Sequence, residues 1–125
     1  MCVDIRFPVT EKKESVIDGI NKNLPGFLKM EVYDYLKPVY MPKEGSVIQM
    51  FLDTYRSISG DISREPKVIG GATYARSMEN IVAFGPLFPG QPERAHMQDE
   101  CISIEDLIKI SQIYAKVLHK LVTEY

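Results

Sequence analysis

The sequence contains two histidines that could take part in chemistry, and their settings differ. His96 lies in a loop just before Glu100, Cys101 and the start of a helix, whereas His119 lies on the polar face of the last helix. A zinc site needs at least three converging His, Cys, Asp or Glu ligands. His96, Glu100 and Cys101 supply those types without a recognised spacing. His96 is therefore either a surface residue or a ligand, and His119 is interpreted as solvated.

The turn Gly70-Gly71-Ala72-Thr73 is a second candidate for ligand binding. Glycines allow backbone amides to approach a ligand, and the start of a helix attracts anions. The turn lacks the downstream Gly-Lys-Ser/Thr of a P-loop, and the GxGxxG pattern of dinucleotide sites is also missing. It is either a tight turn or part of a pocket wall.

Arg76 lies a few residues after this turn, and Arg6 projects opposite the apolar face of the strand expected at the N-terminus. A guanidinium group can bind a carboxylate through two parallel hydrogen bonds. The alternative for each residue is an exposed or ion-paired arginine. The sequence has no GxSxG or HExxH motif and no spacing that favours a Ser-His-Asp triad.

The chain has 125 residues, of which 45% are hydrophobic, and a formal net charge of -2. Such a balance offers no electrostatic case for binding nucleic acid or an anionic membrane, so a small molecule or a protein is the expected partner. The two cysteines form no CxxC pair and predict reduced thiols. No apolar stretch reaches the roughly 18 residues of a membrane span. We therefore expect a cytoplasmic protein.

Hydrophobic periodicity predicts alternating strands and helices. Period-two alternation indicates strands at 2–9 and 28–36, and short apolar runs suggest strands at 67–69 and 80–84. Spacings of three and four predict helices at 11–23, from Ser46 to Gly60, and from Ser103 onward. Prolines and a glycine mark a hinge at 37–45. The loop from Gly85 to Asp99 is either functional or a surface connection.

Five segments occur in an order that resembles the C-terminal part of the di-zinc dipeptidases, above all the bacterial Xaa-His, carnosinase-like group. The aminoacylases and desuccinylases belong to the same clan. The match covers essentially the whole chain, and GGATYAR with FGPLFPG is its most specific part. The segments are DIRFP (4–8), VYMP (39–42), GGATYAR (70–76), AFGPLFPG (83–90), and AH (95–96) with ECI (100–102).

The resemblance implies a fold of the α+β and α/β class. Residues 1–40 would be the strand-helix-strand end of a ferredoxin-like α+β lid. Residues 41–125 would be the C-terminal α/β portion of a zinc-peptidase catalytic domain. The chain would then begin in mid-fold, and the missing N-terminal portion of the enzyme would be its partner.

The resemblance also implies roles for residues. His96 matches the last zinc ligand of a two-zinc centre, whose other ligands and general base would lie upstream of Met1. Arg6 matches the lid arginine that meets the free carboxylate of a dipeptide. Gly70, Gly71, Ala72 and Thr73 match the loop that lines the substrate pocket, and Arg76 either contacts substrate or braces that loop.

Two positions depart from the family pattern. Ala72 stands where a third glycine is common, so a positive φ there would be strained. Asp99 replaces the usual asparagine before Glu100.

The sequence thus predicts part of a zinc-dependent dipeptidase that hydrolyses Xaa-His or similar dipeptides and is inactive by itself. The alternative is a non-catalytic carboxylate-binding or interaction domain derived from the same fold, and a third reading is an unrelated soluble α+β domain. Exposed sheet edges and core faces would favour self-association into a homo-oligomer.

Overall fold

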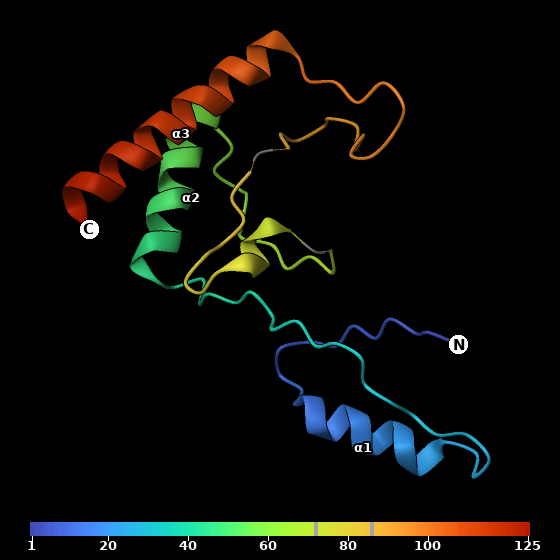
Figure 1. Cartoon of the computed structure of the whole chain (residues 1–125). Helices are drawn as coiled ribbons and strands as arrows, with labels where there is room; N and C mark the ends of the chain where they lie inside the picture. Colours follow the sequence, from blue (N-terminus) through green and yellow to red (C-terminus); the bar gives the residue numbers. More distant parts are fainter. Residues whose placement is uncertain (72, 86) are drawn as a thin grey trace. The chain divides into compact units, whose positions relative to one another are not determined.

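The computed structural model in Figure 1 describes residues 1–71, 73–85 and 87–125. Its regular elements are the helices α1 (Lys13–Asn23), α2 (Ser46–Ser59) and α3 (Ile104–Glu124), and the short 3-10 helix η1 (Tyr74–Ser77). The three long helices confirm the helical segments predicted from periodicity.

The predicted α+β and α/β fold class is wrong for the described residues, because they form helices and no strand. The segments 2–9, 28–36, 67–69 and 80–84 follow irregular paths there. Strands exist only where neighbouring extended segments exchange backbone hydrogen bonds. Outside the helices, every backbone hydrogen bond described joins residues at most four positions apart. Period-two alternation shows which side chains share a face, but it does not supply a second strand.

The chain divides into two compact units. The first unit comprises Met1–Tyr40 with Gly70–Val82, and the second comprises Met41–Ile69 with Ala83–Tyr125. Residues 70–82 thus group with the N-terminal segment. The assignment of 1–40 to a lid and of 41–125 to a catalytic domain stays a prediction.

In the first unit, aromatic contacts tie the N-terminal segment to the chain that follows α1. The rings of Phe7 and Tyr35 stack with centroids 6.4 Å apart, and Lys13 Nζ lies 4.8 Å from the centre of the Tyr35 ring. None of the residues of α1 is buried. This unit is therefore held together by few apolar contacts.

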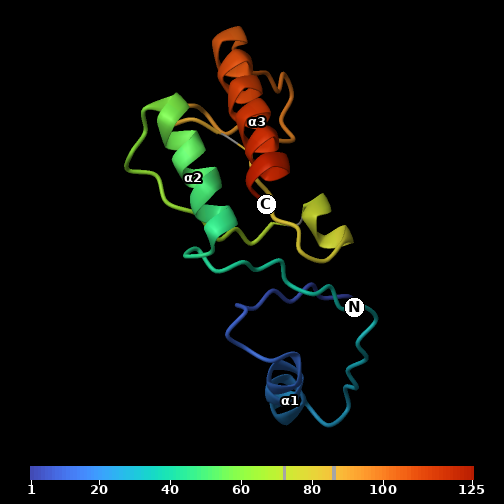
Figure 2. The ribbon, with the colours of Figure 1, turned by 90° about the vertical axis from the view of Figure 1, so that its left-hand side faces the viewer.

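In the second unit, α2 and α3 pack against each other, as both views show (Figures 1 and 2). Helix α3 begins where Ser103 Oγ accepts a hydrogen bond from the Asp106 N–H, an N-cap that satisfies one of the free amides of the first turn. Glu105 and Asp106 also place negative charge at the positive end of the helix dipole. Helix α2 ends at Gly60, whose φ of 75° is the left-handed conformation that glycine adopts without strain.

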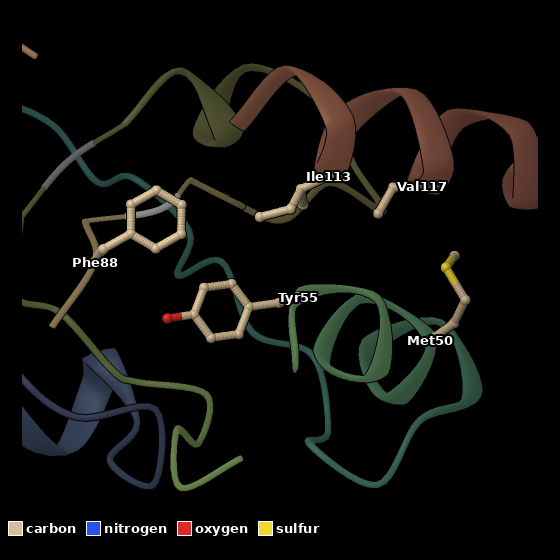
Figure 3. Close-up of a cluster of buried hydrophobic side chains, with 5 residues drawn as sticks. All are labelled: Met50, Tyr55, Phe88, Ile113 and Val117. Atoms are coloured by element: carbon tan, nitrogen blue, oxygen red, sulfur yellow. The ribbon is translucent and has the colours of Figure 1, made fainter. Parts of the chain in front are cut away.

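The core of the second unit lies between these helices. Figure 3 shows Met50 of α2 pointing toward Val117 of α3, while the Tyr55 ring of α2 extends toward the side where Phe88 of the connecting loop lies, near Ile113 of α3. Ile113 has no exposed surface, and the Tyr55 and Phe88 rings stack with centroids 6.1 Å apart. The loop between Gly85 and Asp99 is therefore anchored by Phe88.

Asp61 closes the C-terminal end of α2. Its carboxylate accepts hydrogen bonds from the N–H and Oγ of Ser63 and from Tyr55 Oη, and Arg64 Nε lies 3.7 Å away. Hydrogen bonds from Ser63 are the main reason that the pKa of Asp61 lies below its ordinary value; partial burial opposes them, and Tyr55 and Arg64 add to them. Asp61 is thus held as a carboxylate in the folded state.

A pH-dependent contribution to stability follows. The folded-state pKa of Asp61 is lowered, so its stabilising effect is complete above the unfolded-state pKa of about 3.9 and disappears as the pH falls through the folded value. We expect the free energy of unfolding to fall less between pH 6 and pH 3 in Asp61→Asn than in the unmodified chain. Urea titrations at both pH values measure this, and Ser63→Ala should reproduce part of the effect. An equal fall in all three proteins would contradict the assignment.

None of the helices in the described part of the chain combines the length and hydropathy that a membrane span requires.

Candidate functional site

Arg6 is held by two partners within the first unit. Its Nε and one terminal nitrogen donate to the same Asp4 carboxylate oxygen, at 3.1 and 3.0 Å, and its other terminal nitrogen donates to the Gly70 carbonyl oxygen at 2.5 Å. The side chain nevertheless keeps 63% of its surface exposed. The guanidinium is therefore oriented and still accessible to a ligand.

The structure thus brings together two of the predicted binding residues, Arg6 and Gly70. Gly70 and Gly71 are both exposed, and neither has a positive φ. A Cβ added at either glycine would meet no described atom within 4 Å. The missing side chains at these two glycines leave open space beside the backbone. The predictions made for Ala72, including its positive φ, lie outside the described residues.

Thr73 and Arg76 lie at the two ends of the short helix η1. Thr73 is its N-cap, and its Oγ1 accepts a hydrogen bond from the Ala75 N–H at 3.2 Å. Arg76 is exposed in the last turn. Among the contacts described, no side-chain hydrogen bond or ion pair of Arg76 occurs. The Thr73 hydroxyl therefore has a structural use, whereas the Arg76 guanidinium is directed to solvent.

His96 lies in the second unit, in two consecutive turns before α3. The Met97 N–H donates to the Arg94 carbonyl at 3.0 Å, and the Glu100 N–H donates to the Met97 carbonyl at 3.3 Å. His96 occupies the third position of the first turn with a φ of 63°, and its own N–H donates to the Glu100 carboxylate at 3.2 Å. The imidazole is exposed.

The backbone conformation of His96 is unusual for a residue other than glycine. Left-handed φ values cost of order 1–3 kcal/mol in such residues and persist where the surroundings enforce them, most often at functional sites. Here the two turns and the Glu100 contact enforce it. Asp99, at the third position of the second turn, has a φ of 61°. Aspartate and asparagine tolerate this conformation best, so Asp99 suits this turn position.

The chain does not assemble a metal centre from its described residues. They contain no group of three or more His, Cys, Asp or Glu side chains placed to share an ion. Since zinc needs at least three protein ligands, His96 with its neighbours does not suffice for the two zinc ions that the resemblance implies.

Two residues have supporting roles that were not predicted from the sequence. Asp4 orients Arg6, and the spacing of two positions that puts both on one side of an extended chain was the signal for it. Glu100 fixes the turn at His96, but only its proximity in sequence pointed to it.

The chain is similar to known proteins over most of its length. The family described as Peptidase family M20/M25/M40 matches residues 8–120. A Bacillus subtilis protein named "Putative dipeptidase YtjP" is 32% identical over 121 residues, which are 95% of this chain and 25% of that protein. A Staphylococcus epidermidis protein named "Putative dipeptidase" is 32% identical over 124 residues, 98% of this chain and 26% of that protein. No solved structure shows a significant match.

The chain therefore belongs to peptidase family M20/M25/M40. It spans about a quarter of the length of the relatives that it matches.

Proposed function

We propose that this chain acts in dipeptide hydrolysis, as the part of an M20-family dipeptidase that contributes His96 to a zinc centre and Arg6 to substrate binding. The observation that carries the proposal is the enforced left-handed backbone of the exposed His96, within a chain that the family profile covers from residue 8 to 120. The names of the relatives support a dipeptide as the substrate. An Xaa-His dipeptide is the substrate we propose.

Arg6 suits the recognition of a dipeptide's free carboxylate. Its planar fork of N–H groups matches the two oxygens of a carboxylate, and an internal peptide amide offers only one such acceptor. Two of these nitrogens already donate to one oxygen of the Asp4 carboxylate, and this contact supports the proposal that Arg6 binds a carboxylate ligand. The open space at Gly70 and Gly71 leaves room for the remainder of the ligand beside it.

A second function, carboxylate binding without catalysis, also has a specific observation in its favour. The Arg6–Gly70 contact is complete within this chain, whereas the described residues do not complete a metal centre. A chain that meets no other polypeptide would then bind a carboxylate ligand and leave it unchanged.

A chimera separates the two functions. The segment of YtjP that matches this chain is replaced by residues 1–125, and hydrolysis of β-alanyl-histidine is measured with added zinc. We expect turnover by the chimera and none by the isolated chain, because only the chimera holds a full set of ligands.

Two controls make the outcome decisive. Circular dichroism establishes that the chimera is folded, and unmodified YtjP reports whether the parent cleaves this dipeptide. A folded chimera that is inactive beside an active parent would contradict the dipeptidase role. Turnover by the isolated chain that disappears in His96→Ala would contradict the need for further ligands.

A further inference from the structure

Helix α3 is apolar on two opposite sides, and only one of them is covered. Ile113 and Val117 face α2 and are 0% and 4% exposed. The opposite side, here called the outer stripe, remains open: Ile104, Ile108, Leu118 and Val122 are 78%, 54%, 61% and 85% exposed. Between them lie two small exposed residues, Ser111 and Ala115. The outer stripe therefore consists of Ile104, Ile108, Ser111, Ala115, Leu118 and Val122.

The spacing of the outer stripe is that of a coiled-coil seam. Its members follow one another at intervals of four, three, four, three and four residues. This alternation has the mean period of 3.5 residues that keeps apolar side chains facing a partner helix. The stripe runs along most of α3, from Ile104 to Val122.

The order of residue sizes is symmetric about Ile113. If a second α3 runs antiparallel with its Ile113 at the same level, Ile104 meets Val122, and Ile108 meets Leu118. At the centre Ser111 meets Ala115, and these small side chains let the two backbones approach closely. Each layer then pairs large with large or small with small, which is what an isologous twofold contact between identical surfaces requires.

The residues that flank the outer stripe are complementary in the same arrangement. On one flank Glu105 meets His119, an acid opposite a base, and Gln112 meets its own copy. On the other flank Leu107 meets Leu121, and Tyr114 meets its own copy. The Glu105 side chain is exposed at 78% and pairs within its helix with Lys109. A partner helix therefore finds acid against base on one side and apolar against apolar on the other.

We propose that the outer stripe binds a second copy of this chain in an antiparallel, twofold-symmetric helix pair. The four branched side chains expose about 100 Å² of apolar surface each, so two copies bury roughly 800 Å² from the stripe alone. The flanking residues raise this to about 1,200 Å², the lower end of stable interfaces. This inference is independent of the proposed function, since it involves neither His96 nor Arg6.

Sedimentation of the purified chain tests the interface. We expect a dimer at about 100 µM protein and dissociation on dilution. Leu118→Glu places a charge in two symmetric layers and should raise the dimer dissociation constant at least about a hundredfold. Ile62→Glu, which alters an isoleucine that lies outside α3 and is 79% exposed, should leave the constant within about threefold.

Cysteine cross-linking tests the antiparallel direction. In a Cys2→Ser, Cys101→Ser background, mixing Glu105→Cys with His119→Cys chains should give a disulfide-linked dimer. Glu105→Cys alone should not, because its two copies would lie about 20 Å apart along the helices.

Three results would overturn the proposal. One is a monomer at every concentration, and another is a dimer that Leu118→Glu leaves intact. The third is a monomer that binds the remaining three-quarters of YtjP through the outer stripe.

Discussion

Replacing His96 with alanine in the YtjP chimera is expected to lower kcat/KM for β-alanyl-histidine at least about a hundredfold, because even residues that merely orient a metal ligand cost 10–100-fold when removed. His96 is held in a left-handed turn by its N–H contact with Glu100.

The matched control is the other histidine of the chain. His119 is exposed on α3, in helical backbone and remote in sequence from the turn. His119→Ala should leave kcat/KM within about twofold, and both variants should keep the circular dichroism spectrum of the chimera. Zinc content, measured by mass spectrometry after dialysis, should fall in His96→Ala alone. Full activity or full zinc content in His96→Ala would contradict the role of His96 as a ligand.

Ile113→Ala should be the most destabilising substitution in the second unit. Ile113 is fully buried where α2, α3 and Phe88 meet, so alanine leaves a cavity in the core (Figure 3). Comparable truncations cost about 2–5 kcal/mol, a large part of the 5–15 kcal/mol that stabilises an ordinary domain. A urea titration followed by circular dichroism measures the loss.

Ile62→Ala provides the same chemical change on the surface. Ile62 is 79% exposed, so its truncation should change the free energy of unfolding by less than about 0.5 kcal/mol. If the two variants unfold at the same urea concentration, the α2–α3 contact does not hold this unit together.

The helices could be predicted from the sequence because their determinants are local. In α3, a capping serine at 103, two acids in the first turn and a repeat of three and four residues all lie within the segment itself. The strand predictions failed because a strand depends on a distant partner. Val3 and Ile5 alternate with Asp4 and Arg6 as in a half-buried strand, yet they remain 64% and 46% exposed.

The candidate site was predictable only in part, because its contacts, like those of a strand, join residues that are far apart in the sequence. Arg6 and Gly70 were both identified, but their contact joins residues 64 positions apart, and no local pattern encodes such a distance. The left-handed backbone at His96 and Asp99 was also not foreseen. Histidine and aspartate adopt that conformation more often than most residues but still in a minority of positions, so the residue type alone does not predict it.

The pairing of Arg6 with Asp4 has a consequence for how a ligand would bind. In the free chain the guanidinium already holds a carboxylate, so an arriving dipeptide exchanges one ion pair for another. The Arg6–Asp4 pair is exposed, and a ligand carboxylate at the same guanidinium would be screened by salt in a similar way, so much of the ionic-strength dependence expected for a bare arginine should cancel. Asp4 would act as an internal competitor, and a ligand would displace it only if the rest of the ligand's structure added favourable contacts. Acetate should therefore bind poorly where a dipeptide binds well.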